Sequence, residues 1–302
     1  MTVSILLATR DGARFLPDQL ASYLAQTLSD WQLLASDDAS GDATPAILDR
    51  FCRDHPGRVT LVQGPGKGAA ANFLSLIQAA PDADHTAFSD QDDLWLPGKI
   101  GRAVDMLSRL PPDKPALYAS RVTICDRALS PLGLSPGPDR PPGFRNALVQ
   151  NILHGHSILC NRAAMALLRQ AAGRRPHVVM HDWWAYQIVT GAGGRIVFDD
   201  ESHVLYRQHG GNQIGVRKGM AVGCLLPLQA RQQAQWMTTN LAVLMQAADL
   251  LDPGHHGMLK RIVEARAAGR LAFAGICLRE GLYRQGPGGS LAPAFAALAG
   301  QL

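Results

Sequence analysis

The chain has 302 residues, and 29 lysine and arginine residues against 25 acidic ones give it a formal net charge of +4. Hydrophobic residues make up 47% of the chain and charged residues 18%, a composition that is typical of folded proteins and excludes intrinsic disorder. The near balance of charge also argues against a dedicated nucleic-acid-binding protein, in which a concentrated basic surface is expected.

Short apolar runs and helical patterns alternate along the first part of the chain. We predict strands over residues 3–8, 31–36, 59–62 and 85–89, separated by helices over residues 15–26, 44–52 and 69–80. This alternation is typical of an α/β protein with a parallel sheet, in which ligands bind at the carboxyl ends of the strands. Polar side chains follow three of the predicted strands at that position: Thr9, Arg10, Asp11, Asp37, Asp38 and the acidic residues between 90 and 93.

The pattern changes after residue 123. Residues 130–143 contain five prolines and three glycines, which predicts a loop or a flexible excursion. A mixed segment follows over residues 146–215, and from residue 221 onward the sequence predicts helices with a break at 252–254. The apolar runs are too short for a signal peptide or a membrane span, and five separated cysteines suit reduced thiols, so we expect a cytoplasmic protein.

The segment from Ser89 to Asp93 carries the strongest chemical signal, because Asp90, Asp92 and Asp93 lie within four residues at the end of a strand. Carboxylates this close repel one another unless a cation lies among them. Oxygen ligands favour Mg²⁺ or Mn²⁺ over zinc, and Mg²⁺ commonly bridges carboxylates and substrate phosphates. The alternative is a solvated acidic turn.

Two segments near the other strand ends allow two interpretations each. Asp38 could accept a hydrogen bond from a pyrimidine base or a ribose, or it could belong to a helix N-cap turn. Residues 64–68, with sequence Gly-Pro-Gly-Lys-Gly, resemble a phosphate cradle but lack the P-loop ending and the GxGxxG spacing, so a tight turn is an equal alternative. Lys67 and Asn72 are candidate substrate-binding residues here.

Later segments supply a candidate general base and further ligands. Asp182 lies between His181 and Trp183, a partly apolar setting that can favour a general base, with a core helix as the alternative. His156 could contact an acceptor or serve packing. In residues 205–212, Arg207 suits diphosphate oxygens, and a polar hairpin end is the alternative.

In this order the motifs resemble glycosyltransferase family 2, nearest to the bacterial subgroup of rhamnosyltransferases and other surface-polysaccharide transferases. The resemblance rests on residues 4–12, 36–44, 88–95, 181–184 and 206–209 and covers about residues 1–215. It implies a GT-A fold, an α/β architecture with a Rossmann-like mixed sheet flanked by helices. It also implies a catalytic domain over residues 1–218 and a helical C-terminal region over residues 219–302. The implied chemistry is inverting transfer from a nucleotide-sugar donor, dTDP-rhamnose or a UDP-hexose, with Mg²⁺ or Mn²⁺.

The resemblance assigns the nucleoside side of the site first. Thr9, Arg10 and Asp11 match the family's loop around the nucleoside. Asp38, or else Asp37, matches the aspartate that binds the base.

The reacting side follows from the same resemblance. Asp92 matches the metal-binding residue of the Asp-x-Asp element, His209 is a further candidate metal ligand, and Asp90 matches a ribose-side or water-mediated contact. Asp182 matches the catalytic base, and Arg207 matches the loop that faces the diphosphate.

The chain departs from the family's pattern in two places. His181 stands where many relatives have a glutamate, and it is retained with Trp183 as a candidate substrate contact. The Gln-x-x-Arg-x-Trp motif is absent, which argues against a processive synthase. A nucleotidyltransferase and a sugar-nucleotide-binding protein without transfer activity are the alternative classes.

Residues 221–302 contain seven basic and four acidic residues and supply most of the net charge. Apolar residues are interleaved with the basic ones, which suits an amphipathic surface resting on the inner face of the cell membrane, near a lipid-linked saccharide or other glycan acceptor. The alternative is that these helices pack on the catalytic domain or on a partner subunit, as in a homodimer.

Overall fold

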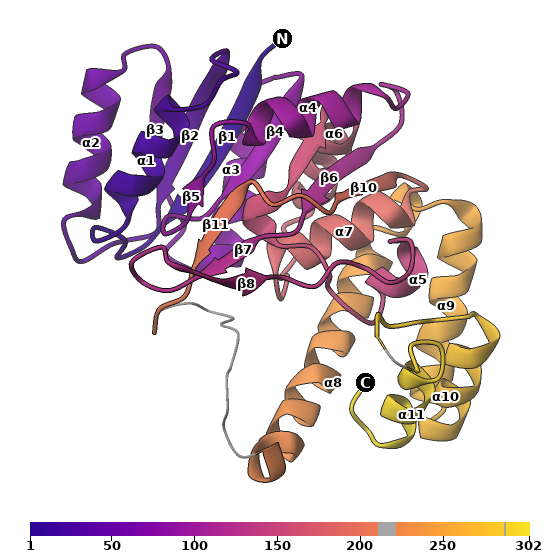
Figure 1. Ribbon diagram of the computed structural model, residues 1–302. Coiled ribbons are helices and arrows are strands. Elements are labelled where there is room, and N and C mark those ends of the chain that lie inside the picture. The colour runs from indigo at the N-terminus through magenta and orange to yellow at the C-terminus, as the bar shows by residue number, and fades with distance from the viewer. Residues whose placement is uncertain (211–221, 287) are drawn as a thin grey trace.

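The structure, a computed structural model, describes residues 1–210, 222–286 and 288–302. A seven-stranded sheet with helices on both faces forms its centre, and a four-stranded sheet lies beside it (Figure 1). In spatial order the large sheet consists of β10 (Arg195–Asp199), β6 (Ala116–Ser120), β9 (Leu159–Asn161), β4 (His85–Ser89), β1 (Val3–Thr9), β2 (Trp31–Asp37) and β3 (Val59–Gln63).

The strands and helices predicted for the first part of the chain are confirmed, with shifts of one or two residues at their ends. The helices between these strands are α1 (Leu16–Leu24), α2 (Thr44–Asp54) and α3 (Ala69–Ala79). β1 runs parallel to β2 and β4, and β2 runs parallel to β3, as the alternation predicts. β9 pairs antiparallel with both β4 and β6, so the sheet is mixed, as the resemblance implies.

β1 is buried on both faces, which explains why its sequence is apolar almost throughout. Because alternate side chains of a strand point to opposite faces, Val3, Ile5 and Leu7 join one hydrophobic cluster, with side chains from α1 and α4 (Lys99–Ser108). Leu6 and Ala8 join the other cluster, with α3, α6 (Arg162–Ala172) and α7 (His181–Gly191). The sheet is therefore fixed between two helical layers.

The small sheet corrects one prediction. Its strands are, in spatial order, β5 (Leu94–Trp95), β11 (Val204–Arg207), β7 (Thr123–Cys125) and β8 (Pro131–Leu134). β8 lies within residues 130–143, for which a loop was predicted, so that prediction is wrong for these four residues. An exposed edge strand tolerates a proline as its first residue, because that position needs no N–H for the ladder.

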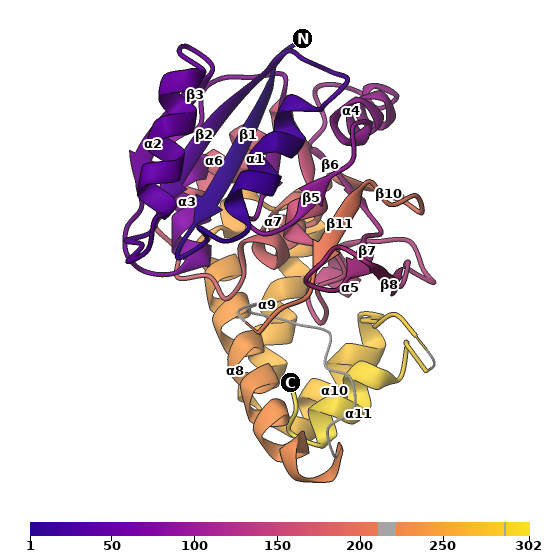
Figure 2. The ribbon, with the colours of Figure 1, turned by 60° about the vertical axis from the view of Figure 1, so that its left-hand side comes forward.

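The C-terminal part of the described chain is helical, as predicted. It contains α8 (Val222–Gln246), the short 3-10 helix η2 (Ala248–Leu250), α9 (Pro253–Ala267), α10 (Arg270–Arg279) and α11 (Ala292–Leu298). Two short helices lie earlier in the chain, before β9: α5 (Phe144–Ala147) and the 3-10 helix η1 (Gly155–Ser157). Figure 2 shows α10 and α11 at the end of the molecule away from the N-terminus. The predicted domain boundary between residues 218 and 219 lies outside the described residues. Within the described residues, no helix has both the length and the apolar character to cross a membrane.

The C-terminal helices share a hydrophobic cluster with the sheet. Leu244 of α8 and Leu259 of α9 are fully buried in the cluster that contains Trp184 and Val189 of α7. Trp236 of α8 also meets Trp183 edge to face, with 6.5 Å between the ring centroids. α8 and α9 therefore stabilise the sheet-bearing part of the molecule.

We predict that Leu244→Ala lowers the free energy of unfolding by about 2–5 kcal/mol, because it opens a cavity in this shared cluster. Leu24, which is 47% exposed on α1, provides the control. Leu24→Ala should change the unfolding free energy by less than about 0.5 kcal/mol. Urea unfolding measures both, and equal midpoints for the two variants would contradict a shared core.

Candidate active site

The loops that follow β1, β2 and β4 lie at one edge of the sheet, because these strands are parallel neighbours. Thr9 at the end of β1 is in register with Asp37 at the end of β2, and its hydroxyl donates to the Asp37 carboxylate over 3.0 Å. The predicted polar residues after these strands are thus brought together, as the alternation requires.

The side chain of Gln91 joins the loop after β1 to the loop after β4. Its Oε1 accepts from the backbone N–H of Arg10, and its Nε2 donates to the carbonyl of Arg10, both over 2.8 Å. A Cβ on Gly12 would lie 2.2 Å from Oε1 of Gln91, so only glycine leaves room for this contact. We call this pair of bonds the Gln91–Arg10 clamp.

The loop after β2 holds residues 9–12 from their other flank. Asp11 has a positive φ of 48°, and its carboxylate accepts from the N–H of Gly41 over 2.7 Å. The N–H of Asp11 in turn donates to the Ser40 hydroxyl over 2.8 Å. Residues 9–12 are therefore fixed by two neighbouring loops before any ligand binds.

Asp38 is buried and organises the glycine-rich turn over residues 64–68. Its two carboxylate oxygens accept from the N–H groups of Gly66 and Gly68 over 2.6 and 2.7 Å. Both glycines have positive φ, which favours glycine, and Lys67 between them is exposed. The N–H groups of this turn thus point at Asp38, and the turn presents the Lys67 side chain to solvent.

Asn72 follows this turn on α3 and is buried. It exchanges hydrogen bonds with Ser36 of β2, accepting from the hydroxyl and donating to the carbonyl. The structure therefore places Asn72 under the loops, where it ties α3 to β2.

Asp90, Asp93 and His156 form a compact group in which one possible ligand atom of each lies within 4.8 Å of the others. Nδ1 of His156 lies 3.4 Å from Oδ2 of Asp90 and 3.2 Å from Oδ2 of Asp93. Burial raises the pKa of Asp93 to about 8, although His156 opposes the rise. Burial alone would lower the pKa of His156, but Asp93 and the hydrogen bond to Asp90 raise it to about 9.

Asp92 faces a different histidine. Its Oδ2 lies 2.7 Å from Nε2 of His209, which follows β11, and the His209 ring packs against Phe15. Burial and the charge of Asp90 raise the pKa of Asp92, although the His209 contact lowers it. The side chains of Asp92 and His209 are 16% and 13% exposed, whereas Asp93 is fully buried.

Arg207 is buried at the end of β11 and links three segments. Its Nε donates to the Asp92 carbonyl over 3.0 Å, and its Nη2 donates to the Asp18 carboxylate over 2.8 Å. The guanidinium also lies over the Phe15 ring, 4.6 Å from the centroid. Arg207 therefore fixes the backbone that carries Asp92.

Asp182 lies in the first turn of α7. Its Oδ1 accepts from the N–H of Trp183 over 2.7 Å. A Cβ on Gly155 would approach Nε2 of His181 to 2.8 Å and Cβ of Asp182 to 3.4 Å. The glycine before His156 thus lets the start of α7 approach the acidic group.

His181 and Trp183 point into the protein. The His181 ring stacks on Phe73 with 3.6 Å between centroids, and burial lowers its pKa. Trp183 donates from Nε1 to the carbonyl of Ala147, in the buried layer. His181 and Trp183 are neighbours of Asp182 in the sequence, but their buried side chains do not share a surface with the Asp182 carboxylate.

Four residues that contact this site were not singled out from the sequence: Phe15, Asp18, Gln91 and Tyr206. Gln91 lies inside the recognised acidic segment, whereas Phe15 and Asp18 belong to α1 and its start. Tyr206, which stacks on His156 with 4.8 Å between centroids, lies within the recognised segment at β11. Residue type alone gave no signal for Phe15 or Asp18, because their partner Arg207 is distant in sequence.

Residues 4–165 match the model of the family described as glycosyl transferase family 2. The chain belongs to this family and is a glycosyltransferase.

Similar proteins agree with this assignment. The dTDP-rhamnosyl transferase RfbG of Shigella flexneri is 27% identical over 224 residues, which cover 69% of this chain and 73% of that protein. The Pyrobaculum calidifontis mannosyltransferase PcManGT, solved with GDP-Man and Mn²⁺, gives a TM-score of 0.53 at 19% identity, over 98% of this chain and 74% of that one. S. aureus TarS with UDP-GlcNAc gives 0.56 at 12% identity, over 92% and 80%. These likenesses confirm the GT-A fold.

We predict that Gln91→Ala accelerates amide exchange at Arg10 by about tenfold or more, because the clamp loses two hydrogen bonds worth about 1 kcal/mol each. Hydrogen exchange followed by mass spectrometry of the peptide that contains residues 9–12 measures this effect. Gln170→Ala, at an exposed position of α6, is the control and should leave the exchange unchanged. Unchanged exchange in Gln91→Ala would show that the clamp does not order the loop.

Proposed function

We propose that the protein is an inverting, metal-dependent glycosyltransferase that moves a sugar from a nucleotide-sugar donor to a glycan or lipid-linked acceptor in surface-polysaccharide biosynthesis. One observation carries the proposal. The nucleoside-side loop with Arg10, the Asp92–His209 pair and the Asp182 carboxylate are grouped around the same sheet edge, and the Gln91–Arg10 clamp joins the first two.

The donor side of the site is assigned to residues 9–11 and the turn that Asp38 holds. Arg10 is more than half exposed, and its Nη1 lies 3.9 Å from Oδ2 of the buried Asp38, so the exposed guanidinium lies beside that carboxylate at the predicted nucleoside position. We assign Asp90, whose side chain is 39% exposed, to the ribose. We propose dTDP-rhamnose or a UDP-hexose as donor, and the likeness to RfbG favours dTDP-rhamnose.

Two groups of side chains fit a divalent cation. In the group of Asp90, Asp93 and His156, Asp90 is 39% exposed but the other two side chains are buried, whereas Asp92 and His209 both reach solvent, with an oxygen and a nitrogen 2.7 Å apart. A cation that also binds a donor diphosphate needs a group in which more than one ligand reaches solvent. We therefore assign Asp92 and His209 to Mg²⁺ or Mn²⁺, which when bound neutralises charge on the diphosphate.

The transfer step uses Asp182 as the base. The acceptor hydroxyl oxygen bonds to the anomeric carbon from the face opposite the diphosphate, and the bond from that carbon to the diphosphate oxygen breaks. The proton of the hydroxyl passes to Oδ2 of Asp182, while Oδ1 stays bonded to the N–H of Trp183. The bond electrons leave with the nucleotide diphosphate, and the configuration at the anomeric carbon inverts.

Arg207 acts in this scheme by holding the Asp92 backbone, because its guanidinium is bonded to the Asp92 carbonyl and to Asp18. Its positive charge is paired with Asp18, so it supports the donor diphosphate through the position of Asp92. The exposed Lys67 lies on the turn that Asp38 organises and can add a second cation on the donor side.

We predict that Asp182→Asn lowers kcat for transfer by about 10²–10⁴-fold, because the amide cannot accept the acceptor proton. Donor affinity should stay unchanged, since Asp182 faces the acceptor. Labelled donor turnover and calorimetric donor binding measure the two quantities, with Asp113→Asn at an exposed position as the control. Full transfer activity in Asp182→Asn would refute its role as the base.

We predict that EDTA abolishes transfer and that added Mg²⁺ or Mn²⁺ restores it. Asp92→Asn should raise the metal concentration needed for half-maximal activity by about tenfold or more, since loss of a ligand or its support costs this much affinity. Asp105→Asn, on the exposed face of α4, is the matched control. Undiminished transfer in EDTA would exclude the metal role of Asp92 and His209.

A further inference from the structure

The outer helices α10 and α11 expose an unusual share of the large apolar side chains. Of the nine such side chains that are strongly exposed among the described residues, five belong to these helices or to Leu291 just before α11. Leu271 is 82% exposed and Phe295 is 66% exposed. We call the set the α10–α11 surface: Leu271, Leu278, Leu291, Phe295 and Leu298.

The spacing of these residues shows that they form stripes along the helices. Leu291, Phe295 and Leu298 follow one another at intervals of four and three residues, which places them on one face of α11. Leu271 and Leu278 are two turns apart on α10. The opposite faces are buried, because Ala294 and Ala297 of α11 and Phe273 of α10 lie in the hydrophobic cluster. The exposed side chains of these stripes therefore do not contribute to the hydrophobic core.

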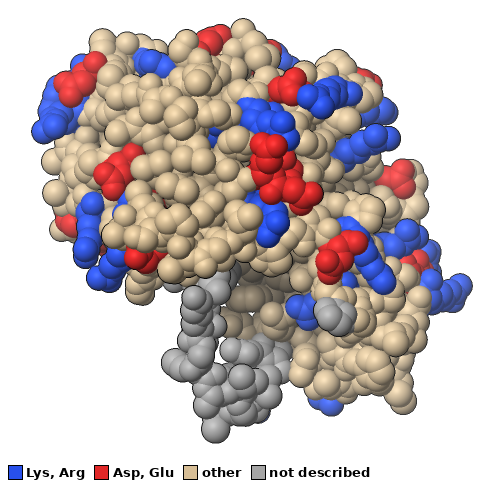
Figure 3. All heavy atoms as spheres, viewed as in Figure 1, with Lys and Arg blue, Asp and Glu red and all other residues tan. Residues whose placement is uncertain are grey.

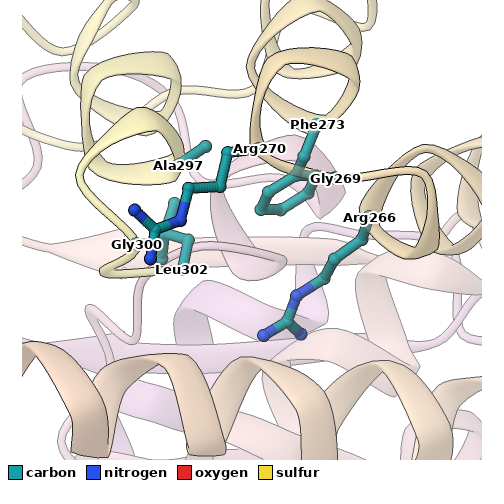
Figure 4. Close-up of a pocket in the computed structure, with 7 residues that line it drawn as sticks. All are labelled: Arg266, Gly269, Arg270, Phe273, Ala297, Gly300 and Leu302. Atoms are coloured by element: carbon teal, nitrogen blue, oxygen red, sulfur yellow. The ribbon is translucent and has the colours of Figure 1, made fainter.

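A cavity of about 220 Å³ opens where α9, α10 and the residues after α11 meet, and it is lined by both arginines and apolar groups (Figure 4). Figure 4 shows the Phe273 ring between the side chains of Arg266 and Arg270. Gly300 has a φ of 70° and no Cβ, which lets the Arg270 guanidinium lie against it. Arg266 donates from Nη2 to the carbonyl of Ala234 of α8 over 2.8 Å, and among the described residues neither arginine has an ion-pair partner. The cavity thus offers two cations beside apolar walls.

The charge around the surface is also one-sided. Residues 253–302 contain six basic and two acidic residues. One of the acids, Glu280, is already paired with Arg261 over 2.7 Å. Figure 3 shows the lower right part of the molecule, where α10 and α11 lie in Figure 1, as a largely uncharged surface with basic and acidic groups at its margin. Apolar side chains bordered by unpaired cations match the acyl boundary and the anionic headgroups of a bilayer.

We propose that the α10–α11 surface docks on a bilayer that contains anionic phospholipid. The leucines and Phe295 enter the boundary between headgroups and acyl chains, and Arg270, which is exposed and adjoins Leu271 at the start of α10, contacts a lipid phosphate. This docking requires no glycosyl transfer. Its use to bring the active site to a lipid-linked acceptor rests on the proposed function.

The test is co-sedimentation of the full chain with vesicles of phosphatidylcholine, with and without phosphatidylglycerol. We expect binding to the anionic vesicles at low salt, weaker binding at high salt because surface charges are screened, and little binding to phosphatidylcholine alone. Transfer to a soluble acceptor is assayed separately, so that loss of the proposed function and loss of docking are distinguished.

Two variants separate the apolar and the cationic contributions. Phe295→Ser combined with Leu298→Ser should weaken vesicle binding by about tenfold or more, whereas Leu132→Ser, at a half-exposed leucine of β8, should not. Arg270→Gln should weaken binding by about fivefold, and Arg53→Gln on the distant α2 should leave it unchanged.

Three results would overturn the proposal. Equal binding to anionic and neutral vesicles would exclude recognition of lipid charge, and unchanged binding in Arg270→Gln would exclude the phosphate site. A dimer that Phe295→Ser with Leu298→Ser dissociates, with no vesicle binding by the original chain, would assign the surface to a second copy instead.

Discussion

The carboxylates of Asp90, Asp92 and Asp93 are concentrated at the end of β4, and the arrangement of the site follows from the need to offset their charge. Burial makes each negative charge costly, and each also repels the other two. The fold supplies His156 from η1 and His209 after β11, both distant from the acidic residues in sequence. At one edge of the sheet, the acidic segment is thus in contact with parts of the chain that are distant from it in sequence.

At the same edge of the sheet, hydrogen bonds and close packing link the parts of the site to one another. The Gln91–Arg10 clamp joins the acidic segment to the loop after β1, and Arg207 joins it to α1 through Asp18. Gly155 lets α7 bring Asp182 close to the His156 loop. A donor that orders one of these segments therefore acts on segments already bonded to one another, which reduces the entropy lost on binding.

The C-terminal helices play two physical roles. α8 and α9 extend the hydrophobic cluster under the sheet, whereas α10 and α11 keep their exposed apolar side chains outside it. Because the first pair is buried against the sheet, the second pair is held at a fixed place relative to the active site. Such an arrangement suits an enzyme whose acceptor lies at a surface.

The sequence by itself determined β1 to β4 and the loops after them, because period, burial and turn chemistry are local properties. It also singled out the acidic segment by its residue types, and the resemblance of its motif order to a known family singled out Asp182. The pairing of Asp92 with His209, the Gln91–Arg10 clamp and the antiparallel insertion of β9 were decided only by the tertiary structure. Each depends on contacts between segments far apart in the chain, and local sequence patterns do not specify which distant side chain makes a given contact.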